Sequence, residues 1–514
     1  MSVIELFDHG VALGPSRPCL VFDGRVRLYA QVQAASCRVA NALLRDGLTL
    51  GTNVAVLSPN APSAVECVLG VLRAGCAWVP VDSRAPQQET LALLRAADVS
   101  VLFYAGACAP VAAEARRSLA RIRRAVCIDG HGSGDTLDRW LQGVSDTRPE
   151  PVIPAEAIAL LAADDIDEPP LRAAMISHRA WAFRAAQTLL RTPGPAPISL
   201  VTGPACGAAG VRMLELMAAG GTHVLLPGFD PAAATAAVGR HGVTHLELPS
   251  MALERLLGWP GVRKGQFGSL ACLTYVGAQL SAERTAEAVE VFGPVLAHGY
   301  GSAEMGDCAA WLSPQDLLDA LRAEDFRRLA SRGRPNPLVR IEVMNELGHL
   351  LPAGAPGEIV VRSHGLASGR LGEDPSGEGM VRDGWLRTGD VGFKDRDCWV
   401  YVGDRKADVI VSAGMDVFPS DVESVLRSHP GVRDCAVVGA PHPLWGQAVT
   451  AVVELLPGAS AGEAELKALC KESLASHQTP KAVQVWTELP RLADGRVSKR
   501  RVRERVWQEL SEAG

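Results

Sequence analysis

Short apolar runs that alternate with amphipathic segments limit the possible folds of this chain more than any other feature. Residues 54–57, 77–81 and 101–104 are three such runs, each with the length of one buried strand. Between the first two, the apolar side chains of residues 65–72 recur with the spacing of one helical face, and Gly75 then ends the helix. Strands and helices that alternate in this way form parallel sheets covered by helices. The sequence therefore predicts an α/β fold.

The middle of the chain predicts more of this fold and then a change. Residues 223–248 repeat the strand-and-helix alternation, which extends the layered α/β part. Residues 333–402 instead contain short strands joined by turns rich in Gly and Pro. This second pattern is typical of a small β-rich subdomain.

The last part of the chain predicts a separate small α+β domain. Its apolar runs are strand-like, and they are separated by amphipathic segments and a strongly basic end. The spacing of Ser420 and Glu423 predicts a capping box at the start of one helix. We therefore expect a large N-terminal domain, residues 1–403, and a C-terminal domain, residues 404–514.

Charge and hydropathy argue against several classes of protein. The net charge is −6 and no long basic run is present, so we expect no nucleic-acid partner and no membrane-surface binding. No run of about 18 apolar residues could span a bilayer, and the N-terminus lacks the basic start of a secretory signal. The 12 cysteines show no C-x-x-C spacing, which favours buried thiols over a zinc site. A cytoplasmic protein is therefore expected.

Four segments together indicate a family. They read YGSAE at 300–304, WLRTGD at 385–390, GDRKADVIVSAGMDVFP at 403–419 and HPLWGQ at 442–447. In this order and spacing, over nearly the whole chain, the segments resemble the superfamily of acyl-CoA synthetases, peptide-synthetase adenylation domains and luciferases. The resemblance is greatest to bacterial fatty-acid and aryl acyl-CoA ligases. It implies an N-terminal acyl- and adenylate-binding domain and a mobile C-terminal lid.

The resemblance implies an adenylate site. Asp390 matches the carboxylate that accepts the ribose hydroxyls, a role that suits a group able to accept two O–H donors. Arg405 matches a second ribose or phosphate contact. Tyr300 matches the ring that stacks on adenine, and Gly277 and Ala278 match the residues along the adenine edge. From the residues alone, Asp390 could instead be a turn cap and Tyr300 a core side chain.

The resemblance also assigns three catalytic positions. Glu304 matches a Mg²⁺ ligand, for which a carboxylate oxygen is the preferred donor. Arg405 would stabilise AMP as it departs. Asp404 matches the hinge about which the lid turns between an adenylating and a thioester-forming pose. The alternative for Glu304 is an ordinary surface charge. We predict no resident metal, and Mg²⁺ only if ATP is used.

A coenzyme A site is implied by the same matches. Ser412, Ala413 and Gly414 match the small-residue loop beside the pantetheine tunnel, where a thiol arm must pass close to backbone. Trp445 stands where an aryl-CoA ligase stacks the CoA adenine, and Lys481 matches a basic residue near the CoA phosphates. Ordinary packing for Trp445 and a solvated charge for Lys481 are the alternatives.

The phosphate-binding segment departs from the family pattern. The family has a Gly- and Thr-rich loop shortly before a helix that opens M-x-S-H, which is present here at 175–178. Residues 164–173 replace that loop with four acids and one base: Asp164, Asp165, Asp167, Glu168 and Arg172. A like-charge pair at ~4 Å costs roughly 1 kcal/mol in water and about 4 kcal/mol at an effective dielectric near 20. The segment is therefore predicted to be a poor ATP cradle, or simply a solvated acidic loop.

Two further family positions are altered. The lysine that bridges carboxylate and phosphate during adenylation is replaced by Arg496, whose planar fork is larger and aimed differently. Lys499, three residues on, could substitute. In the middle motif, Cys206 and Gly207 replace an aromatic–His pair, which predicts a widened acyl pocket. No neighbouring His or acid supports Cys206 as a nucleophile.

The pattern of losses predicts an enzyme of one half-reaction. Features that hold a triphosphate are altered, whereas those that hold an adenylate and admit CoA remain. We therefore expect transfer of a bulky terpenoid or aryl acyl group from a preformed acyl-adenylate to CoA, with a separate adenylating enzyme as functional partner. This resembles the thioesterification-only ligases of platensimycin and platencin biosynthesis. A complete ATP-dependent ligase, a non-catalytic binding protein and an amide-forming enzyme are the alternatives.

Overall fold

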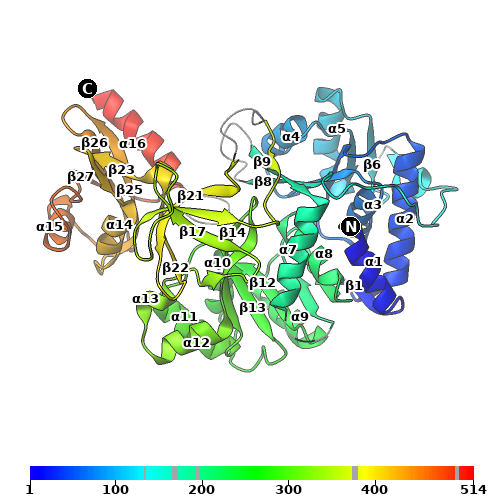
Figure 1. Cartoon of the computed structure of the whole chain (residues 1–514), viewed down its shortest axis with the longest axis horizontal. Helices are drawn as coiled ribbons and strands as arrows, with labels where there is room; N and C mark the ends of the chain where they lie inside the picture. Colours follow the sequence, from blue (N-terminus) through cyan, green and yellow to red (C-terminus); the bar gives the residue numbers. More distant parts are fainter. Residues whose placement is uncertain are drawn as a thin grey trace. The chain divides into compact units, whose positions relative to one another are not determined.

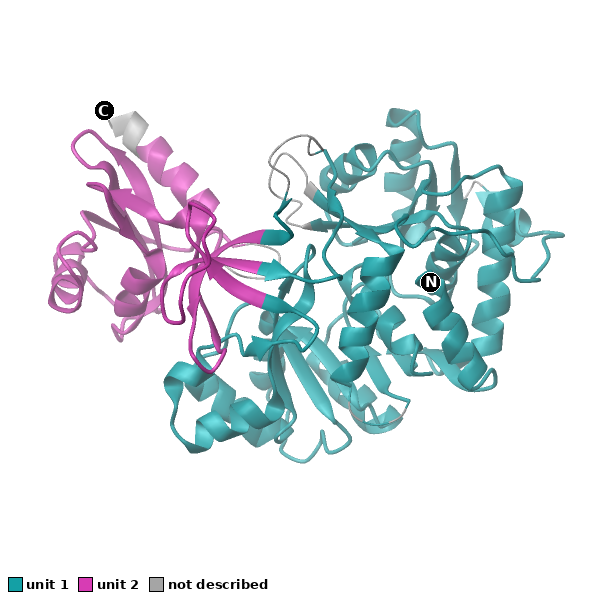
Figure 2. Cartoon of the chain, viewed as in Figure 1, with its two compact units in different colours: residues 1–340, 361–386 teal, residues 341–360, 387–514 magenta. Residues whose placement is uncertain are grey.

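The computed structural model describes residues 1–131, 135–164, 172–192, 194, 196–372, 380–491 and 497–513. The chain divides into two compact units (Figure 2), residues 1–340 with 361–386 and residues 341–360 with 387–514. The predicted boundary at 403/404, which stays a prediction, falls inside the second unit. The described residues contain no helix long and apolar enough to cross a membrane.

The first unit contains an eight-stranded sheet that explains the apolar runs of the sequence. Its order is β19-β9-β8-β4-β3-β5-β6-β7, and β3 pairs in parallel with both β4 and β5. The strands are β3 (Asn53–Leu57), β4 (Ala77–Val81), β5 (Val101–Tyr104), β6 (Arg124–Cys127), β7 (Asp135–Thr136), β8 (Ile158–Asp164), β9 (Arg172–Ser177) and β19 (Gly369–Arg370). The three predicted strands at 54–57, 77–81 and 101–104 are therefore confirmed as β3, β4 and β5. The apolar side chains on one face of these strands pack into one core with α4 (Gln87–Ala96) and α5 (Ala109–Ser118).

A nine-stranded sheet forms the rest of the first unit. Its order is β16-β15-β14-β13-β12-β10-β11-β1-β2, and Figure 1 labels β1, β12, β13 and β14 of this sheet. The strands are β1 (Pro18–Phe22), β2 (Arg25–Leu28), β10 (Ile198–Val201), β11 (Thr222–Leu225), β12 (His245–Pro249), β13 (Cys272–Val276), β14 (Leu296–Ser302), β15 (Gly306–Leu312) and β16 (Arg334–Pro335). Strands β10 to β14 are parallel, as the alternation in residues 223–248 predicts. The predicted α/β fold class is thus confirmed.

The other helices of the first unit follow the same alternation with the strands. They are α1 (Ile4–Leu13), α2 (Tyr29–Arg45), α3 (Pro62–Arg73), α6 (Leu137–Trp140), α7 (His178–Leu190), α8 (Ala208–Met217), α9 (Pro231–His241), α10 (Ser250–Leu257), α11 (Ala282–Phe292), α12 (Pro314–Arg322) and α13 (Phe326–Leu329). Helix α7 begins at the end of β9, where the side chain of Ser177 accepts a hydrogen bond from the N–H of Ala180. This hydrogen bond caps the N-terminus of α7 and so fixes where the helix begins.

The β-rich segment of the sequence forms a third, five-stranded sheet. Its order is β17-β18-β21-β20, with β22 on β21. The strands are β17 (Arg340–Met344), β18 (Gly357–Arg362), β20 (Val381–Arg382), β21 (Trp385–Lys394) and β22 (Val400–Arg405). The chain passes from one unit to the other within β17, β18 and β21.

The C-terminal part of the second unit is an α+β layer built on one sheet of order β24-β23-β26-β25, with β27 on β26. Its elements are β23 (Ile410–Ser412), β24 (Met415–Val417), α14 (Pro419–Arg427), β25 (Val432–His442), β26 (Gly446–Leu455), α15 (Glu463–Ser473), β27 (Ala482–Trp486) and α16 (Lys499–Ala513). Alternate residues of β25 point to two cores. Cys435 and Val437 pack with residues of α14 and α15, whereas Ala436 and Val438 pack with residues of α16.

Candidate active site

The residues predicted for adenine binding lie at the carboxyl ends of two parallel strands. Gly277 follows the last residue of β13, and Tyr300, which is 8% exposed, lies near the end of β14. Val276 pairs with Gly299, so the two strand ends are neighbours. Gly277 has φ +94, a backbone conformation that side-chain-bearing residues rarely adopt, and Ala278 beside it is exposed. Ligands of open parallel sheets bind at such strand ends, which fits the predicted use of this edge.

Glu304 is held by a cation from another strand. The guanidinium of Arg370 in β19 lies 2.6 Å from Oε1 of Glu304, and the Ser302 hydroxyl donates to Oε2 at 2.7 Å. Burial alone would raise the pKa of the Glu304 carboxyl, but the Ser302 hydroxyl and the Arg370 guanidinium together lower it. Both oxygens of the carboxylate are therefore engaged. In this arrangement the predicted Mg²⁺ ligand does not present a free oxygen pair to a metal ion.

Arg184 is a buried positioning residue that the sequence reasoning missed. From α7 it donates hydrogen bonds to three backbone carbonyls, those of Ala303, Glu304 and Gly365. Burial lowers the pKa of Arg184 to about 10, which still leaves it charged at neutral pH. The side chain ties the segment after Tyr300 to helix α7. The sequence shows an Arg on this helix but not its burial, which is what marks it, since charged side chains are rarely buried without partners.

A cavity of about 460 Å³ lies in the first unit beside these residues. Its wall includes the adenine-edge segment, with Gly277, Gly301 and Ser302, and also Gly207 from the altered middle motif. Cys206 is fully buried and does not line the cavity, and burial raises the pKa of its thiol to about 12. A thiol with that pKa stays protonated at neutral pH, so it is not a reactive nucleophile.

One side of the cavity wall is polar, which sequence reasoning did not foresee. Helix α7 and its C-cap contribute Arg184, Gln187, Thr188 and Arg191, and α8 contributes Arg212 and Glu215. The spacing of the four α7 residues places them on one helical face. That spacing was visible in the sequence, but without a known core direction it could not be distinguished from a solvated stripe.

Asp390 and Arg405 are brought together in the second unit. They are direct partners in the pairing of β21 with β22, and Nε of Arg405 lies 3.6 Å from Oδ1 of Asp390. Arg405 is 56% exposed, whereas the Asp390 side chain is 16% exposed. The predicted ribose carboxylate and the predicted ribose or phosphate contact thus share one position of a sheet, with the carboxylate partly sheltered and the guanidinium more exposed.

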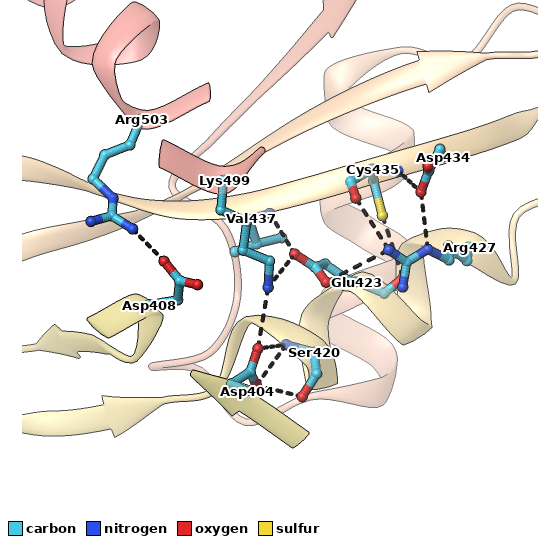
Figure 3. Close-up of polar contacts among 10 residues, drawn as sticks. All are labelled: Asp404, Asp408, Ser420, Glu423, Arg427, Asp434, Cys435, Val437, Lys499 and Arg503. Atoms are coloured by element: carbon cyan, nitrogen blue, oxygen red, sulfur yellow. Dashed lines mark hydrogen bonds and ion pairs between the residues drawn. The ribbon is translucent and has the colours of Figure 1, made fainter. Parts of the chain in front are cut away.

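The predicted hinge residue, Asp404, caps a helix and pairs with a lysine (Figure 3). Its carboxylate accepts hydrogen bonds from the backbone N–H and the hydroxyl of Ser420, and Nζ of Lys499 lies 3.2 Å away. Lys499 also lies 2.9 Å from Glu423, whose carboxylate accepts the N–H of Val437. Burial would lower the pKa of Lys499, but the two carboxylates outweigh this effect and raise it. We call Asp404, Ser420, Glu423 and Lys499 the lid cluster.

The predicted capping box is wrong. Helix α14 begins at Pro419 with Phe418 as its N-cap, so Ser420 lies inside the first turn. Its hydroxyl and N–H are used by Asp404 instead. Glu423 turns toward Lys499 and Val437 rather than back to the helix start. A carboxylate from β22, 16 residues earlier, therefore caps this helix.

All five residues predicted for CoA binding lie near one another in the second unit. Ala413 and Gly414, with φ +53 and +77, form the two-residue turn between β23 and β24, directly after the buried Ser412. The N–H of Ala413 donates to the carbonyl of Trp445 at 2.9 Å, and Nζ of Lys481 lies 5.3 Å from the Trp445 ring centroid. Short backbone and ring contacts thus bring the turn, the indole and the lysine to one place.

Trp445 also contacts a histidine of its own motif. The ring of His442 stacks on the indole, with centroids 4.0 Å apart and an interplanar angle of 16°. The indole is only partly buried. A flat, partly exposed ring beside a cation can stack a planar base, which is what CoA would require of it.

Several altered family positions fall outside the described residues. These are Asp165, Asp167, Glu168 and Arg496. Asp164 and Arg172 end β8 and begin β9, where they are backbone partners. Strands β8 and β9 pair in an antiparallel manner in the eight-stranded sheet.

Comparison with known proteins shows which families share this architecture. Residues 7–162 and 172–371 match the AMP-binding enzyme family, and residues 421–496 match the AMP-binding enzyme C-terminal domain. The chain is 29% identical over 504 residues to the fatty acid–[acyl-carrier-protein] ligase ScoC of Streptomyces coeruleorubidus, covering 96% of this chain and 94% of that one. It is 29% identical over 497 residues to a feruloyl-CoA synthase of an Amycolatopsis species, covering 96% of each.

A solved structure shows the same fold. The amide bond synthetase McbA of Marinactinospora thermotolerans superposes with a TM-score of 0.85 at 29% identity, covering 98% of this chain and 99% of that one. Acyl-CoA ligases of the matched family use CoA, ATP and Mg²⁺. Since the family match covers well over half of the residues, this chain belongs to the AMP-binding enzyme family, the adenylate-forming enzymes that include the acyl-CoA ligases.

Proposed function

We propose that this protein transfers an acyl group from a preformed acyl-adenylate to CoA and releases AMP, with adenylation from ATP lost or strongly impaired. The observation that carries the proposal is the pairing of Glu304 with Arg370 at 2.6 Å. A guanidinium already occupies the carboxylate that would hold Mg²⁺ during adenylation. The thioester-forming half needs no triphosphate and no metal at that position.

The triphosphate side gives a second line of support. The stretch 164–168 contains four carboxylates where the family has glycines and hydroxyls. The family match is interrupted between residues 162 and 172, over the same stretch. Carboxylates repel phosphate oxygens, and the missing glycines remove the backbone N–H cradle that phosphates require.

The CoA side supports the second half-reaction. The turn at Ala413 and Gly414 carries no side chain larger than a methyl group, and it is hydrogen-bonded to the backbone of Trp445. In the proposed reaction the CoA sulfur bonds to the acyl carbonyl carbon while the bond to the AMP phosphate oxygen breaks. The thiol gives up its proton to water, and AMP leaves with the electron pair of the broken bond. Because the adenylate is already activated, correct positioning of the thiol supplies most of the rate.

The proposed roles of the other residues follow this scheme. Asp390 would bind the ribose and Arg405 the phosphate of the departing AMP, and Tyr300 would stack on adenine. Asp404 would be the hinge between residues 1–403 and 404–514. A separate adenylating enzyme would supply the substrate, and the widened pocket at Gly207 would admit a bulky aryl or terpenoid acyl group, as in the thioesterification-only ligases of platensimycin and platencin biosynthesis.

Amide formation is a second candidate, because the protein resembles an amide bond synthetase over nearly its whole length. An amine acceptor would need neither the small-residue turn nor a stacking indole. The grouping of Ala413, Gly414, Trp445 and Lys481 therefore favours CoA as the acceptor. Similarity to a feruloyl-CoA synthase supports the same choice and an aryl acyl group.

The test compares two reactions on the same protein. One contains synthetic acyl-adenylate and CoA, and the other contains free acid, ATP, Mg²⁺ and CoA, with AMP and acyl-CoA measured in both. Product from the adenylate alone is expected. Comparable turnover from ATP would overturn the loss of adenylation, and product with an amine but none with CoA would favour the amide-forming alternative.

A pair of variants tests the CoA site. Trp445→Ala is expected to raise the KM for CoA about tenfold with a small change in kcat. The reason is that a stacking contact contributes about as much binding free energy as one hydrogen bond. Leu444→Ala, at the adjacent side chain that is 81% exposed, is the matched control and should leave KM unchanged. Equal effects of the two variants would remove Trp445 from the CoA site.

A further inference from the structure

The polar side of the 460 Å³ cavity contains a buried charge cluster. Nε of Arg212 lies 3.1 Å from Glu247, and its Nη1 lies 3.5 Å from Glu215 and donates to the Thr188 hydroxyl. Thr188 in turn donates to Glu215 at 2.5 Å. Ion pairs and hydrogen bonds thus join these groups, although the contact between Arg212 and Oε2 of Glu247 is an ion pair without hydrogen-bond geometry.

Two donors beside this cluster are not satisfied in the same way. Nε2 of Gln187 and Nη1 of Arg191 are both buried and have no hydrogen-bond partner among the described residues. Gln187 is 5% exposed, and both residues line the cavity. Buried donors in native proteins are nearly always paired, so unpaired ones in a cavity wall call for an explanation. A ligand acceptor inside the cavity would provide their missing partner.

Arg191 is held in place without using this donor. Its guanidinium lies 4.7 Å from the centroid of the Trp311 ring, and its Nε donates to the carbonyl of Gln187 at 3.1 Å. The two contacts orient the planar group and leave Nη1 available. Gln187 and Arg191 are four residues apart, so their side chains lie on the same face of the helix.

A second, smaller cavity of about 60 Å³ shares Arg191 and Arg212 with the first. It contains a further buried ring nitrogen without a described partner, Nε2 of His245. The part of the main cavity next to these arginines is therefore the polar part. The adenine-edge segment, Gly277 with Gly301 and Ser302, forms another part of the same wall.

The charged residues that line the two cavities limit which kind of ligand group can bind there. The two cavities together are lined by three arginines and four carboxylates. An additional anion would increase the excess of negative charge in a poorly solvated space. A neutral oxygen acceptor satisfies the two donors without this penalty.

We propose that the acyl group accepted by this cavity carries a neutral oxygen acceptor, a hydroxyl, carbonyl or ether, that is bound by Gln187 and Arg191. The inference rests on the proposed function in one respect, namely that an acyl-adenylate is the ligand of this cavity. It makes the two residues specificity determinants. A site built to bind a substrate oxygen discriminates against the analogue without it, because its own donors are then left unpaired.

The test measures binding rather than turnover. Three acyl-sulfamoyl adenosines, which are stable mimics of acyl-adenylates, share one aryl skeleton and differ at one position, which holds a hydroxyl, a methyl or a carboxylate. Titration calorimetry on the full-length protein should give the hydroxyl compound an affinity at least tenfold above both others, about the effect of one hydrogen bond. Equal or tighter binding of the methyl compound overturns the proposal, and tightest binding of the carboxylate overturns the neutral acceptor.

Variants assign the preference to the two residues. Gln187→Leu and Arg191→Met should each bring the hydroxyl-to-methyl affinity ratio close to one, while Arg191→Lys should retain part of it. Gln266→Leu, the same change at an exposed site of the first unit, is the matched control and should keep the full ratio. An unchanged ratio in both cavity variants overturns the assignment.

The outcome separates this inference from the proposed function. A preference for the hydroxyl compound without acyl-CoA formation from the matching adenylate would overturn the proposed function and leave the polar subsite standing. Acyl-CoA formation with equal affinity for all three mimics would overturn the polar subsite and leave the proposed function standing. Failure to bind any of the three compounds would overturn both.

Discussion

The lid cluster of the second unit and the polar wall of the first unit both bury charged and polar groups. They differ in how completely those groups are paired. In the lid cluster, Lys499 lies between Asp404 and Glu423, and each carboxylate has further N–H or O–H donors. In the cavity wall, Arg212 and its carboxylates are paired, but Gln187 and Arg191 each retain a buried donor without a described partner. Complete pairing indicates a structural role, whereas incomplete pairing beside a cavity indicates a binding role.

Breaking the lid cluster should have the largest effect. Lys499→Met leaves the carboxylate of Asp404 buried without its cation and leaves Glu423 with only Arg427, 3.6 Å away, which should destabilise the second unit by about 3 to 5 kcal/mol. Hydrogen exchange of β25 and β26 amides is the measurement, because it reports on this unit separately. A loss below about 1 kcal/mol would contradict a structural role for the lysine.

Removing the cation of the cavity wall should have a smaller effect. Arg212→Met leaves Glu215 and Glu247 without this cation, but each carboxylate lines a cavity, Glu215 the 460 Å³ cavity and Glu247 the smaller one. We expect a loss of about 2 kcal/mol, less than for a pair sealed from solvent. Calorimetric melting of the ligand-free protein measures it. A loss as large as that of Lys499→Met would mean that the wall is as closed and structural as the lid cluster.

Removing an unpaired donor should stabilise the protein. Gln187→Leu replaces a buried amide that lacks a described partner with an apolar side chain of similar size, so the ligand-free protein should gain about 1 kcal/mol. Thermal melting measures the gain. Gln266→Leu, which removes one exposed hydrogen bond from the Arg263 N–H to Oε1, should instead cost up to about 1 kcal/mol. Clear destabilisation by Gln187→Leu would show that its amide has a partner that the fold requires.

The two units should also respond to opposite extremes of pH. The pKa of Lys499 is raised, so its contribution is complete below the ordinary value of 10.5 and declines as the pH rises through the folded-state value. The pKa of Glu304 is lowered, so its contribution is complete above the ordinary value of 4.5 and declines as the pH falls through the folded-state value. Unit-resolved hydrogen exchange across pH, with Lys499→Met and Glu304→Gln as references, should show these opposite losses. If lowering the pH from neutral toward 5 removed the stability that Lys499 contributes, the assignment of that stability to the charged form of Lys499 would be contradicted.

The smallest effect is expected from a partly exposed pair of the second unit. Lys467 lies 2.7 Å from Glu463, one turn away on α15, with side chains 32% and 52% exposed, and its Nζ also donates to the carbonyl of Lys481. Lys467→Met should therefore destabilise by only about 0.5 to 1 kcal/mol, measured by the same exchange of amides. If Lys467→Met lost nearly as much stability as Lys499→Met, then burial would not be what determines how much an ion pair stabilises this unit.

The short-range features of this protein were predictable from its sequence. The strands β3, β4 and β5 followed from runs of apolar residues, and the α/β class from their alternation with helices. The turn at Ala413 and Gly414 was predictable as a small-residue loop, because such a turn depends on the residues within it. The five residues matched to a CoA site lie within two motifs and one later lysine, and local strand pairing accounts for most of their proximity.

Long-range pairings were decided only by the tertiary structure. Glu304 and Arg370 are 66 residues apart, and Asp404 and Lys499 are 95 apart, so no local spacing reveals them. The capping box predicted at Ser420 was wrong for this reason, since a carboxylate from another strand competes successfully for its donors. The polar stripe on α7 was visible in the sequence, but only packing determines whether such a face meets solvent, a core or a cavity. Chemical character is a property of the residues, whereas pairing and burial are set by the whole fold.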